Sequence, residues 1–281
     1  MTSGRDLQGS PLVAYLGPAG TFSEMAMVKY FGSSVTGIAC GSIDEVFQKV
    51  EATLAAHAVV PIENSTEGGI GRTMDLLVAT PLKICGEVVL RVRQNLMATS
   101  AQALTAFSTV YSHPQSFGQC AKWLATNLPQ AERIPAASNA EAARLALKDA
   151  ASCAIGPALA AERSGLKILL PDIEDDPRNM TRFLVLGTKA AVRTGKDHTS
   201  LVMSAQNRPG AVLDLISPFA RHAVSMTRIE SRPARTGHWE YLFFIDIDGH
   251  QNDEPVKQAL AEVSQKAPFL KVFGSYPAAP L

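Results

Sequence analysis

The feature that most constrains the fold is an alternation between short, wholly apolar runs and segments with helical spacing. Residues 12–17, LVAYLG, form such a run, and residues 21–31 then place apolar side chains at helical intervals. Residues 42–52 predict a second helix, residues 56–65 a strand and residues 73–80 a third helix. Strands that are apolar on both faces need cover on both faces. This order therefore predicts an α/β unit with a largely parallel sheet.

A second stretch of the same kind follows an extended crossing. Residues 84–99 are rich in β-forming side chains and predict a crossing into a second lobe. Residues 109–128 predict strand, turn and helix, and residues 138–149 predict a helix that Ser138 caps. Residues 153–165 add another strand, a Gly-Pro turn and a helix.

These patterns divide the chain into four parts. Residues 1–10 predict a disordered leader, because they lack the apolar core of a secretory signal. Residues 11–188 predict a two-lobed domain, and residues 189–198 a polar linker. Residues 199–281 predict a small ferredoxin-like βαββαβ domain, which by analogy is more often regulatory or oligomerising than catalytic. Lobe 1 is expected at about 11–95 and 168–188, and lobe 2 at about 96–167.

Composition narrows the class of partner. The 281 residues include 26 basic and 26 acidic side chains, so no charge excess favours nucleic acid or an anionic membrane. No run approaches the roughly 20 apolar residues of a membrane span. Cys40, Cys85, Cys120 and Cys153 stand singly, without a CxxC pattern or histidines at metal spacing. Isolated thiols fit a reducing cytoplasm better than a disulfide framework or a zinc site. We therefore expect a cytoplasmic protein without a metal.

Four polar clusters fall at the ends of predicted strands, where α/β sheets bind their ligands. Three of them, at residues 17–21, 63–66 and 112–115, follow their strands. The fourth, Thr181 and Arg182, precedes its strand. If that strand runs antiparallel to its neighbours, its start lies at the same edge as their ends. All four clusters are then expected to converge on one cleft.

The same segments carry a resemblance to a known family. In this order and spacing, four motifs resemble the signature set of the prephenate dehydratases: GPAGTFSEMA, PIENSTEGGI, YSHPQSFGQC and NMTRFLVLG. NRPGAVLDL and TRIESRP resemble the phenylalanine-binding motifs of an attached ACT domain. The resemblance covers about residues 12–276. It implies a catalytic domain of two lobes, like a type II periplasmic binding protein, followed by a βαββαβ ACT domain. Nothing ahead of Leu12 resembles a chorismate mutase, so the chain looks like the monofunctional form.

The activity that the resemblance implies is conversion of prephenate to phenylpyruvate, CO2 and water in L-phenylalanine biosynthesis, without metal or organic cofactor. Feedback by phenylalanine at the ACT domain is implied with it. Prephenate carries two carboxylates and a ring hydroxyl, and loss of CO2 with the hydroxyl makes an aromatic ring. The barrier is departure of hydroxide. A site must therefore donate a hydrogen bond to the leaving oxygen and hold two anions in place.

Carried over position by position, the resemblance implies Thr181 as the donor to the leaving oxygen. A threonine hydroxyl is a poor acid, so we expect hydrogen-bond stabilisation, with a water relay as one route, rather than full protonation. The alternative is a strand-entry residue, since threonine favours extended backbone. The implied substrate-binding residues are Thr21, Asn64, Ser65, Thr66, Ser112, His113, Gln115, Arg182 and Phe183.

Several of these residues leave alternatives open. Arg182 either offers charge to a carboxylate or fixes the loop, and Phe183 is expected to supply an apolar wall for the ring. His113 has a side chain suited to general acid chemistry, but its place before a proline favours holding the loop. Many family members have Glu-Asn-Thr-Ser where this chain has residues 63–66 as Glu-Asn-Ser-Thr, which leaves the division of labour between the two hydroxyls open. Glu63 is expected to be a structural acceptor.

The implied phenylalanine site lies in the ACT domain. Its residues are Asn207, Gly210, Ala211, Val212, Leu213, Glu230, Ser231, Arg232 and Pro233. A helix that begins after Gly210 offers unpaired N–H groups to an α-carboxylate. Glu230 would take the ammonium group or brace the loop, and Arg232 is a ligand, an interface residue or an ordinary surface cation. Because a βαββαβ unit leaves a sheet edge exposed, we expect a homodimer or homotetramer paired through ACT domains.

The sequence is compatible with two other functions. An arogenate dehydratase would act on the same ring with an amino group in place of the keto oxygen, and the sequence does not separate the two substrates. A non-catalytic, amino-acid-sensing binding protein would keep both the cleft and the ACT domain. The Thr181-Arg182-Phe183 motif favours an enzyme, because a binding protein needs no donor aimed at a leaving hydroxyl.

Overall fold

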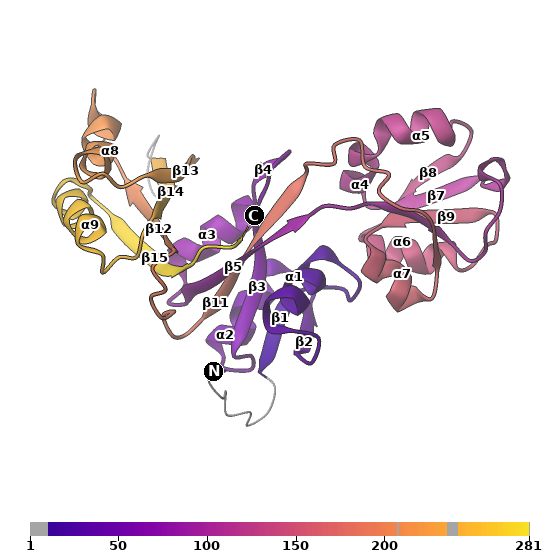
Figure 1. The fold of residues 1–281 in the computed structure, drawn as a ribbon, viewed down its shortest axis with the longest axis horizontal. Helices are drawn as coiled ribbons and strands as arrows, with labels where there is room; N and C mark the ends of the chain where they lie inside the picture. Colours follow the sequence, from indigo (N-terminus) through magenta and orange to yellow (C-terminus); the bar gives the residue numbers. More distant parts are fainter. Residues whose placement is uncertain (1–10, 207, 235–240, 281) are drawn as a thin grey trace.

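The computed structural model describes residues 11–206, 208–234 and 241–280, and these form three units, each built on its own sheet (Figure 1). Lobe 1 lies in the middle of the view, lobe 2 on its right and the C-terminal unit on its left. The expected leader, residues 1–10, and Asn207 lie outside the described residues. Of the helices in the described ranges, none has the length and apolar character that a membrane crossing requires.

Lobe 1 is a mixed sheet covered on both faces. Its strands are β1 (Leu12–Leu16), β2 (Thr36–Cys40), β3 (His57–Asn64), β4 (Gly68–Gly69), β5 (Lys83–Arg91) and β11 (Met180–Gly187), in the order β2-β1-β3-β11-β5 with β4 against β3. Helix α1 (Phe22–Phe31) covers one face, and α2 (Ile43–Glu51) and α3 (Gly71–Ala79) cover the other. Strand β11 runs antiparallel to β3 and β5, so its start lies at the edge where β3 ends.

Lobe 2 is a second α/β unit. Its strands are β6 (Asn95–Ala98), β7 (Thr109–Ser112), β8 (Glu132–Pro135), β9 (Ser152–Gly156) and β10 (Lys167–Leu170), in the order β10-β6-β9-β7-β8. Its helices are α4 (Pro114–Gln119), α5 (Ala121–Asn127), α6 (Asn139–Ala146) and α7 (Ala158–Ser164), with a 3-10 turn, η1 (Leu104–Ala106). Because β10 pairs with β6, the return to lobe 1 begins after Leu170, a few residues later than the expected boundary at about 168.

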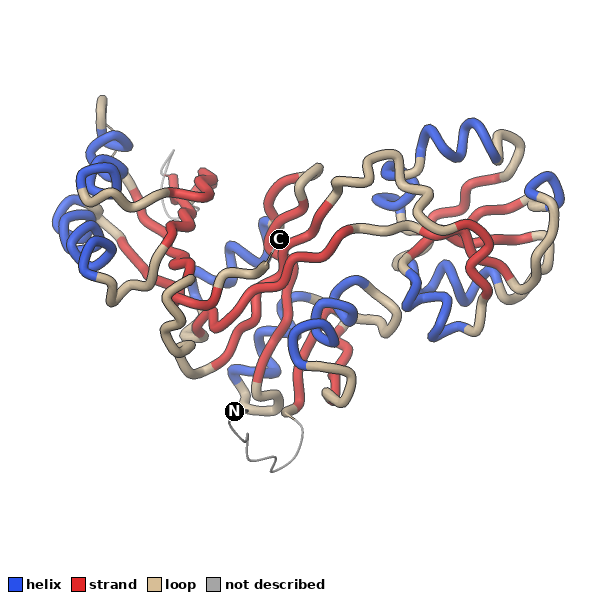
Figure 2. Tube along the Cα trace, viewed as in Figure 1, coloured by secondary structure: helices blue, strands red, loops and turns tan. Residues whose placement is uncertain are grey.

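Two neighbouring crossings join the lobes (Figure 2). The first is residues 92–94 and the second residues 171–179. They are tied to each other, because the Val92 N–H donates to the Asn179 carbonyl at 2.9 Å and the Ile173 N–H donates to the Gln94 carbonyl at 2.8 Å. The two backbone segments that connect the lobes are therefore hydrogen-bonded to each other.

The C-terminal unit has the expected βαββαβ order. Its elements are β12 (Asp197–Ser204), α8 (Ala211–Arg221), β13 (Met226–Pro233), β14 (Tyr241–Asp248), α9 (Glu254–Lys266) and β15 (Leu270–Pro277), with sheet order β13-β14-β12-β15. One face of this sheet packs on α8 and α9. The other face, with Phe244 and Phe273, shares a core with Ile84 and Leu184 of lobe 1. The C-terminal unit is thus packed against lobe 1 through a continuous apolar core.

Candidate active site

A cavity of about 310 Å³ lies between the two lobes, within the roughly 300–1,000 Å³ typical of small-molecule sites. From lobe 1 it is lined by Leu16, Gly17, Thr21, Phe22, Ser23, Ile43, Pro61, Asn64, Ile70, Thr181 and Phe183. From lobe 2 it is lined by His113, Gln115, Ala137, Ser138 and Asn139. Each of the four polar clusters contributes to this wall. The predicted convergence is confirmed, and its cause is the antiparallel direction of β11.

Thr181 and Asn64 form the central pair of this cavity. They are directly opposite in the ladder between β11 and β3, and the Asn64 Nδ2 group donates to the Thr181 Oγ1 at 2.9 Å. Nδ2 also donates to Asn179 Oδ1 at 2.9 Å. Asn64 Oδ1 accepts from the backbone N–H groups of Thr66 and Glu67 at 3.0 and 3.1 Å. The amide is thus fixed at both ends. Because the Thr181 oxygen accepts from Asn64, its own proton remains available for another partner.

Ser65 and Thr66, both expected to contact substrate, do not line the cavity. The Ser65 Oγ accepts from the Met180 N–H at 2.9 Å, and the Ser65 N–H donates to the Met180 carbonyl at 2.8 Å. Ser65 therefore ties the turn after β3 to the start of β11. Of the two hydroxyl residues, Ser65 is the one that braces the strand carrying Thr181.

On the lobe 2 side, His113 caps a helix. It is the N-cap of α4, and its Nδ1 accepts from the Gln115 N–H at 3.3 Å. This contact supports the interpretation that His113 holds its loop. Ser112 is fully buried and donates to the Ile155 carbonyl at 3.0 Å, so it supports the wall from behind.

Asn139 is a cavity residue that the sequence analysis missed. Its Oδ1 accepts from the His113 N–H at 3.1 Å and from the Ser116 Oγ at 3.1 Å. It therefore holds the α4 turn against the start of α6. A signal was present, because Asn139 directly follows the predicted helix cap Ser138, and helix starts in α/β units face the ligand edge of the sheet.

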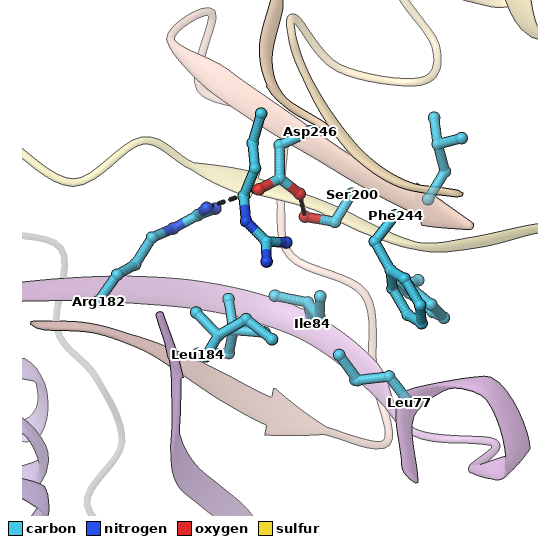
Figure 3. A pocket seen from close by; sticks show the side chains of 11 residues that line it. Leu77, Ile84, Arg182, Leu184, Ser200, Phe244 and Asp246 are labelled. Carbon is cyan, nitrogen blue, oxygen red and sulfur yellow. Dashed lines mark hydrogen bonds and ion pairs between the residues drawn. The ribbon is translucent and has the colours of Figure 1, made fainter. Parts of the chain in front are cut away.

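Arg182 faces away from the cavity, and the expectation that it contacts substrate is wrong. Successive side chains of a strand point to opposite faces, so Thr181 and Phe183 line the cavity while Arg182 points to the C-terminal unit. Its guanidinium binds Asp246 of β14 at 2.6 Å (Figure 3). It also donates to the Tyr276 hydroxyl of β15 at 2.9 Å. The physical reason is the period of two along β11.

With Arg182 turned away, none of the described residues that line the cavity is a lysine or arginine. Two helix starts border the cavity instead. Helix α1 begins after Thr21, whose side chain makes no capping hydrogen bond, and α6 begins after Ser138 on the opposite lobe, whose Oγ accepts from the Glu141 N–H at 3.0 Å. The first N–H groups of a helix have no partner within the helix and lie at the positive end of its dipole. Two helix starts from opposite lobes therefore suit a ligand with two carboxylates.

A smaller polar extension of about 50 Å³ adjoins Thr181 and reaches the crossings. Gln94 lies there, and its Nε2 donates to Ser116 Oγ at 3.0 Å and to Gln119 Oε1 at 2.9 Å. Its Oε1 is buried and has no hydrogen-bond partner among the described protein groups. A polar space of this size is large enough for water, which needs roughly 10–15 Å³. A water relay to Thr181 is therefore sterically possible.

The lobes also touch through α1 and α7. Glu24 of α1 is buried, accepts from the Gly20 N–H at 2.5 Å and pairs with Arg163 of α7 at 2.5 Å. A Cβ on Gly20 would lie 3.3 Å from atoms of both Ala140 and Ala160, and its φ is +90°. Glycine at this position of the GPAG motif is therefore needed for close approach of the lobes.

The site chemistry rests on neutral donors. Within the described ranges, no three His, Cys, Asp or Glu side chains gather in a way that could hold a metal ion. All four cysteines are free, and burial raises the pKa of Cys153 to about 12. A thiol of this kind is a poor nucleophile at neutral pH.

Comparison with known proteins agrees with this geometry. Residues 13–191 match the prephenate dehydratase family model and residues 199–265 match the ACT domain model. A bifunctional chorismate mutase/prephenate dehydratase of Neisseria gonorrhoeae is 48% identical over 271 residues, which cover 96% of this chain and 75% of that protein.

Two solved structures extend the comparison. Prephenate dehydratase from Arthrobacter aurescens in complex with L-Phe superposes with a TM-score of 0.88 at 34% identity, covering 95% of this chain and 90% of that one. A protein described as a quorum-quenching acylase, GqqA, superposes with a TM-score of 0.86 at 27% identity, covering 96% and 98%. The overall fold alone therefore does not assign a reaction. The prephenate dehydratase family model matches more than half of the residues of this chain. The chain therefore belongs to the prephenate dehydratase family, and its C-terminal unit is an ACT domain.

Proposed function

We propose that this chain catalyses the decarboxylating dehydration of prephenate to phenylpyruvate, CO2 and water. The observation that carries the proposal is the Asn64–Thr181 pair, which presents a hydroxyl with a free proton to a cavity between two lobes. Family membership supplies the substrate, and this pair supplies the group that the reaction needs.

In the reaction, the ring carboxylate leaves as CO2 and its electron pair enters the ring. The bond from the ring to the hydroxyl oxygen breaks, and the departing hydroxide takes up a proton from solvent to form water. A donor to that oxygen lowers the barrier, because its hydrogen bond strengthens as negative charge develops. The amide of Asn64 donates to the Thr181 oxygen, and such a chain of hydrogen bonds polarises the terminal O–H. Thr181 is therefore the proposed catalytic residue.

The remaining cavity groups would orient the substrate. The starts of α1 and α6, on opposite lobes, would each receive one carboxylate. Phe183, which is buried beneath the cavity, would form the apolar floor for the ring, with Phe22 beside it. Placing both anions fixes the ring hydroxyl relative to Thr181, and this is how positioning lowers the entropic part of the barrier.

The assay that tests the proposal incubates the protein separately with prephenate and with arogenate and follows product absorbance. Phenylpyruvate formed from prephenate is the expected result. Turnover of arogenate alone would make the protein an arogenate dehydratase. Binding without turnover of either compound would favour the amino-acid-sensing protein and refute the enzymatic proposal.

We further propose that L-phenylalanine regulates this activity at the ACT domain. In support, Gly210 has φ +78° and is the N-cap of α8, which leaves the first N–H groups of that helix without a side-chain cap. Val212 and Leu213 of the first turn are 37% and 64% exposed, so apolar surface adjoins these groups. Asn207 lies outside the described residues.

The second half of the proposed effector site is β13. Ser231 and Pro233 are exposed, while Glu230 binds Arg228 and Arg232 pairs with Asp75 of α3 at 3.3 Å. Among the described residues, no hydrogen bond or ion pair joins β13 to the Gly210 turn. We propose that a ligand held by both takes these two segments from different copies of the chain.

Pairing of two copies through ACT domains is accordingly part of the proposal. Strand β13 is at the edge of its sheet, and Ile229 and Met226 on it are 50% and 37% exposed. An exposed edge with apolar side chains is a surface that a second strand can cover. Light scattering is expected to give a homodimer or homotetramer at micromolar concentration, and a monomer alone would contradict this assembly.

The free cysteines support a cytoplasmic location.

Replacing Gly210 with leucine is expected to weaken phenylalanine inhibition on the order of tenfold while uninhibited activity survives, since allosteric couplings are typically 5–150-fold. The side chain would block the ligand and strain a left-handed backbone. Gly165→Leu is the matched control, because Gly165 has φ +79°, has equally open space and lies in lobe 2. Changing Glu230 and Ser231 together to alanine is the second variant. Inhibition as strong as in the parent would place the effector elsewhere.

A further inference from the structure

A buried polar cluster joins the ACT domain to lobe 1, and Arg182 is at its centre. The guanidinium donates to Glu87 Oε2 at 2.6 Å, to Asp246 Oδ2 at 2.6 Å and to the Tyr276 hydroxyl at 2.9 Å. Glu87, Asp246 and Tyr276 are all buried. Figure 3 shows Arg182 reaching from lobe 1 to Asp246, which in turn contacts Ser200. A planar guanidinium with all three nitrogens engaged has one orientation.

The partners of Arg182 are themselves held in place. Ser200 bonds to both Asp246 and Tyr276. On the other side, His198 Nδ1 lies 2.9 Å from Glu87 Oε1, and the contact with Glu87 raises the pKa of His198. Burial alone would raise the pKa of Glu87, but the His198 hydrogen bond and the Arg182 charge outweigh it and lower that pKa to about 2. Glu87 is therefore ionised at neutral pH, and the cluster is a charged network with fixed geometry.

Arg182, at the centre of this cluster, directly follows Thr181, the proposed catalytic residue, along β11. In the ladder between β11 and β3, Thr181 is opposite Asn64, and Arg182 is opposite Glu63. Glu63 also reaches the ACT domain, where it pairs with Arg228 of β13 at 3.1 Å. On both strands, the residue next to the active-site residue is therefore held by the ACT domain from the opposite face of the sheet.

The ladder between β11 and β3 is irregular at this point. Between Arg182 and Phe183 the register of β11 against β3 shifts, and a shift of this kind disrupts the local ladder. Before Met180 the chain is the crossing, residues 171–179, rather than a strand. Thr181 is thus the second residue of β11; its pairing with Leu90 of β5 is regular, but the ladder with β3 becomes irregular after Arg182. On the β3 side, Asn64 contacts the Thr181 hydroxyl on one face of the sheet, and Arg182, the next residue of the strand, is held on the other face.

We propose that Arg182 is a positioning residue through which the docked ACT domain places the Thr181 hydroxyl for catalysis. Asp246 and Tyr276 hold the guanidinium, the guanidinium fixes the start of β11, and the start of β11 fixes Thr181 relative to Asn64. This inference rests on the proposed dehydratase function. It differs from a purely structural role, in which the cluster only holds two domains together.

The test is a double-mutant cycle on kcat and KM for prephenate. Asp246→Asn and Tyr276→Phe are made in the parent and in the Thr181→Ala background, with Glu262→Gln on the far side of the ACT domain as control. In the parent, each cluster variant is expected to lower kcat by about tenfold or more with little change in KM, since small misplacements of a reacting group cost up to about a hundredfold. In the Thr181→Ala background, the same substitutions should change kcat less than about twofold, because the hydroxyl that the cluster is proposed to place is absent.

Each outcome decides the question. The positioning role would be overturned if the cluster substitutions lowered kcat by the same factor in both backgrounds. It would also be overturned if they left kcat unchanged in the parent background. Neither result would affect the proposed dehydratase function. A parent protein with no turnover of prephenate would instead refute the proposed function. Tyr276→Phe removes a single oxygen and keeps the packing, so it carries the test if circular dichroism shows that Asp246→Asn does not fold.

Discussion

Replacing Thr181 with alanine is expected to lower kcat by about a hundredfold or more and to leave KM nearly unchanged. Loss of one donor to a developing oxyanion typically costs about 10²–10³ in kcat, and the expected loss falls on kcat because the hydrogen bond strengthens only as the leaving oxygen gains charge. Steady-state kinetics with prephenate, compared at equal folded fraction by circular dichroism, measure the effect.

Thr181→Ser is the matched control. Serine keeps a hydroxyl at the same carbon within reach of Asn64 Nδ2, which donates to the Thr181 oxygen at 2.9 Å. It should therefore retain most of the turnover that alanine loses. An alanine variant that keeps most of its kcat would remove Thr181 from the mechanism, and equal losses for serine and alanine would show that the methyl group matters rather than the hydroxyl.

Much of the architecture could be predicted, because its signals are local. Apolar runs and helical spacing predicted both lobes and the βαββαβ domain. The convergence of the polar clusters was expected only if the strand after Thr181 ran antiparallel to its neighbours, and β11 does so. Strand β2 was missed because it carries no such signal. It is an edge strand in which only Cys40 is buried.

The face on which Arg182 lies was predictable and was overlooked. A period of two along β11 puts Thr181 and Phe183 on one face and Arg182 on the other, so all three cannot line one cavity. The partners of Arg182 were not predictable in the same way. Asp246 and Tyr276 are 64 and 94 residues away in the sequence, and nothing local indicates which face of the ACT sheet packs on lobe 1.

The glycines of the TEGGIG stretch show the same limit. The sequence excludes a dinucleotide-binding loop here but gives no other role to these residues. In the structure, a Cβ at Gly69 would collide with the Glu230 carboxylate, and one at Gly71 would collide with the Arg232 guanidinium. A side chain at either glycine would displace these ACT-domain side chains, so the fit depends on long-range contacts.

The second large effect is expected for stability, when Arg182 is replaced with methionine. Methionine keeps much of the apolar stem but leaves Glu87 and Asp246 buried without their shared cation. Removing one partner of a buried ion pair typically costs about 3–5 kcal/mol, because the remaining charge is desolvated and uncompensated.

Denaturant unfolding followed by circular dichroism measures this loss, and calorimetry shows whether the ACT domain and lobe 1 still unfold together. Arg221→Met is the control, because Arg221 belongs to an ion pair with Glu262 in which both side chains are substantially exposed, so the unfolding midpoint should stay unchanged within error. Because Arg182 holds two domains, its loss should also separate one transition into two. An Arg182→Met protein that unfolds in one transition at the parent's midpoint would show that the apolar core around Phe244 and Phe273 docks the ACT domain without help from the charged cluster.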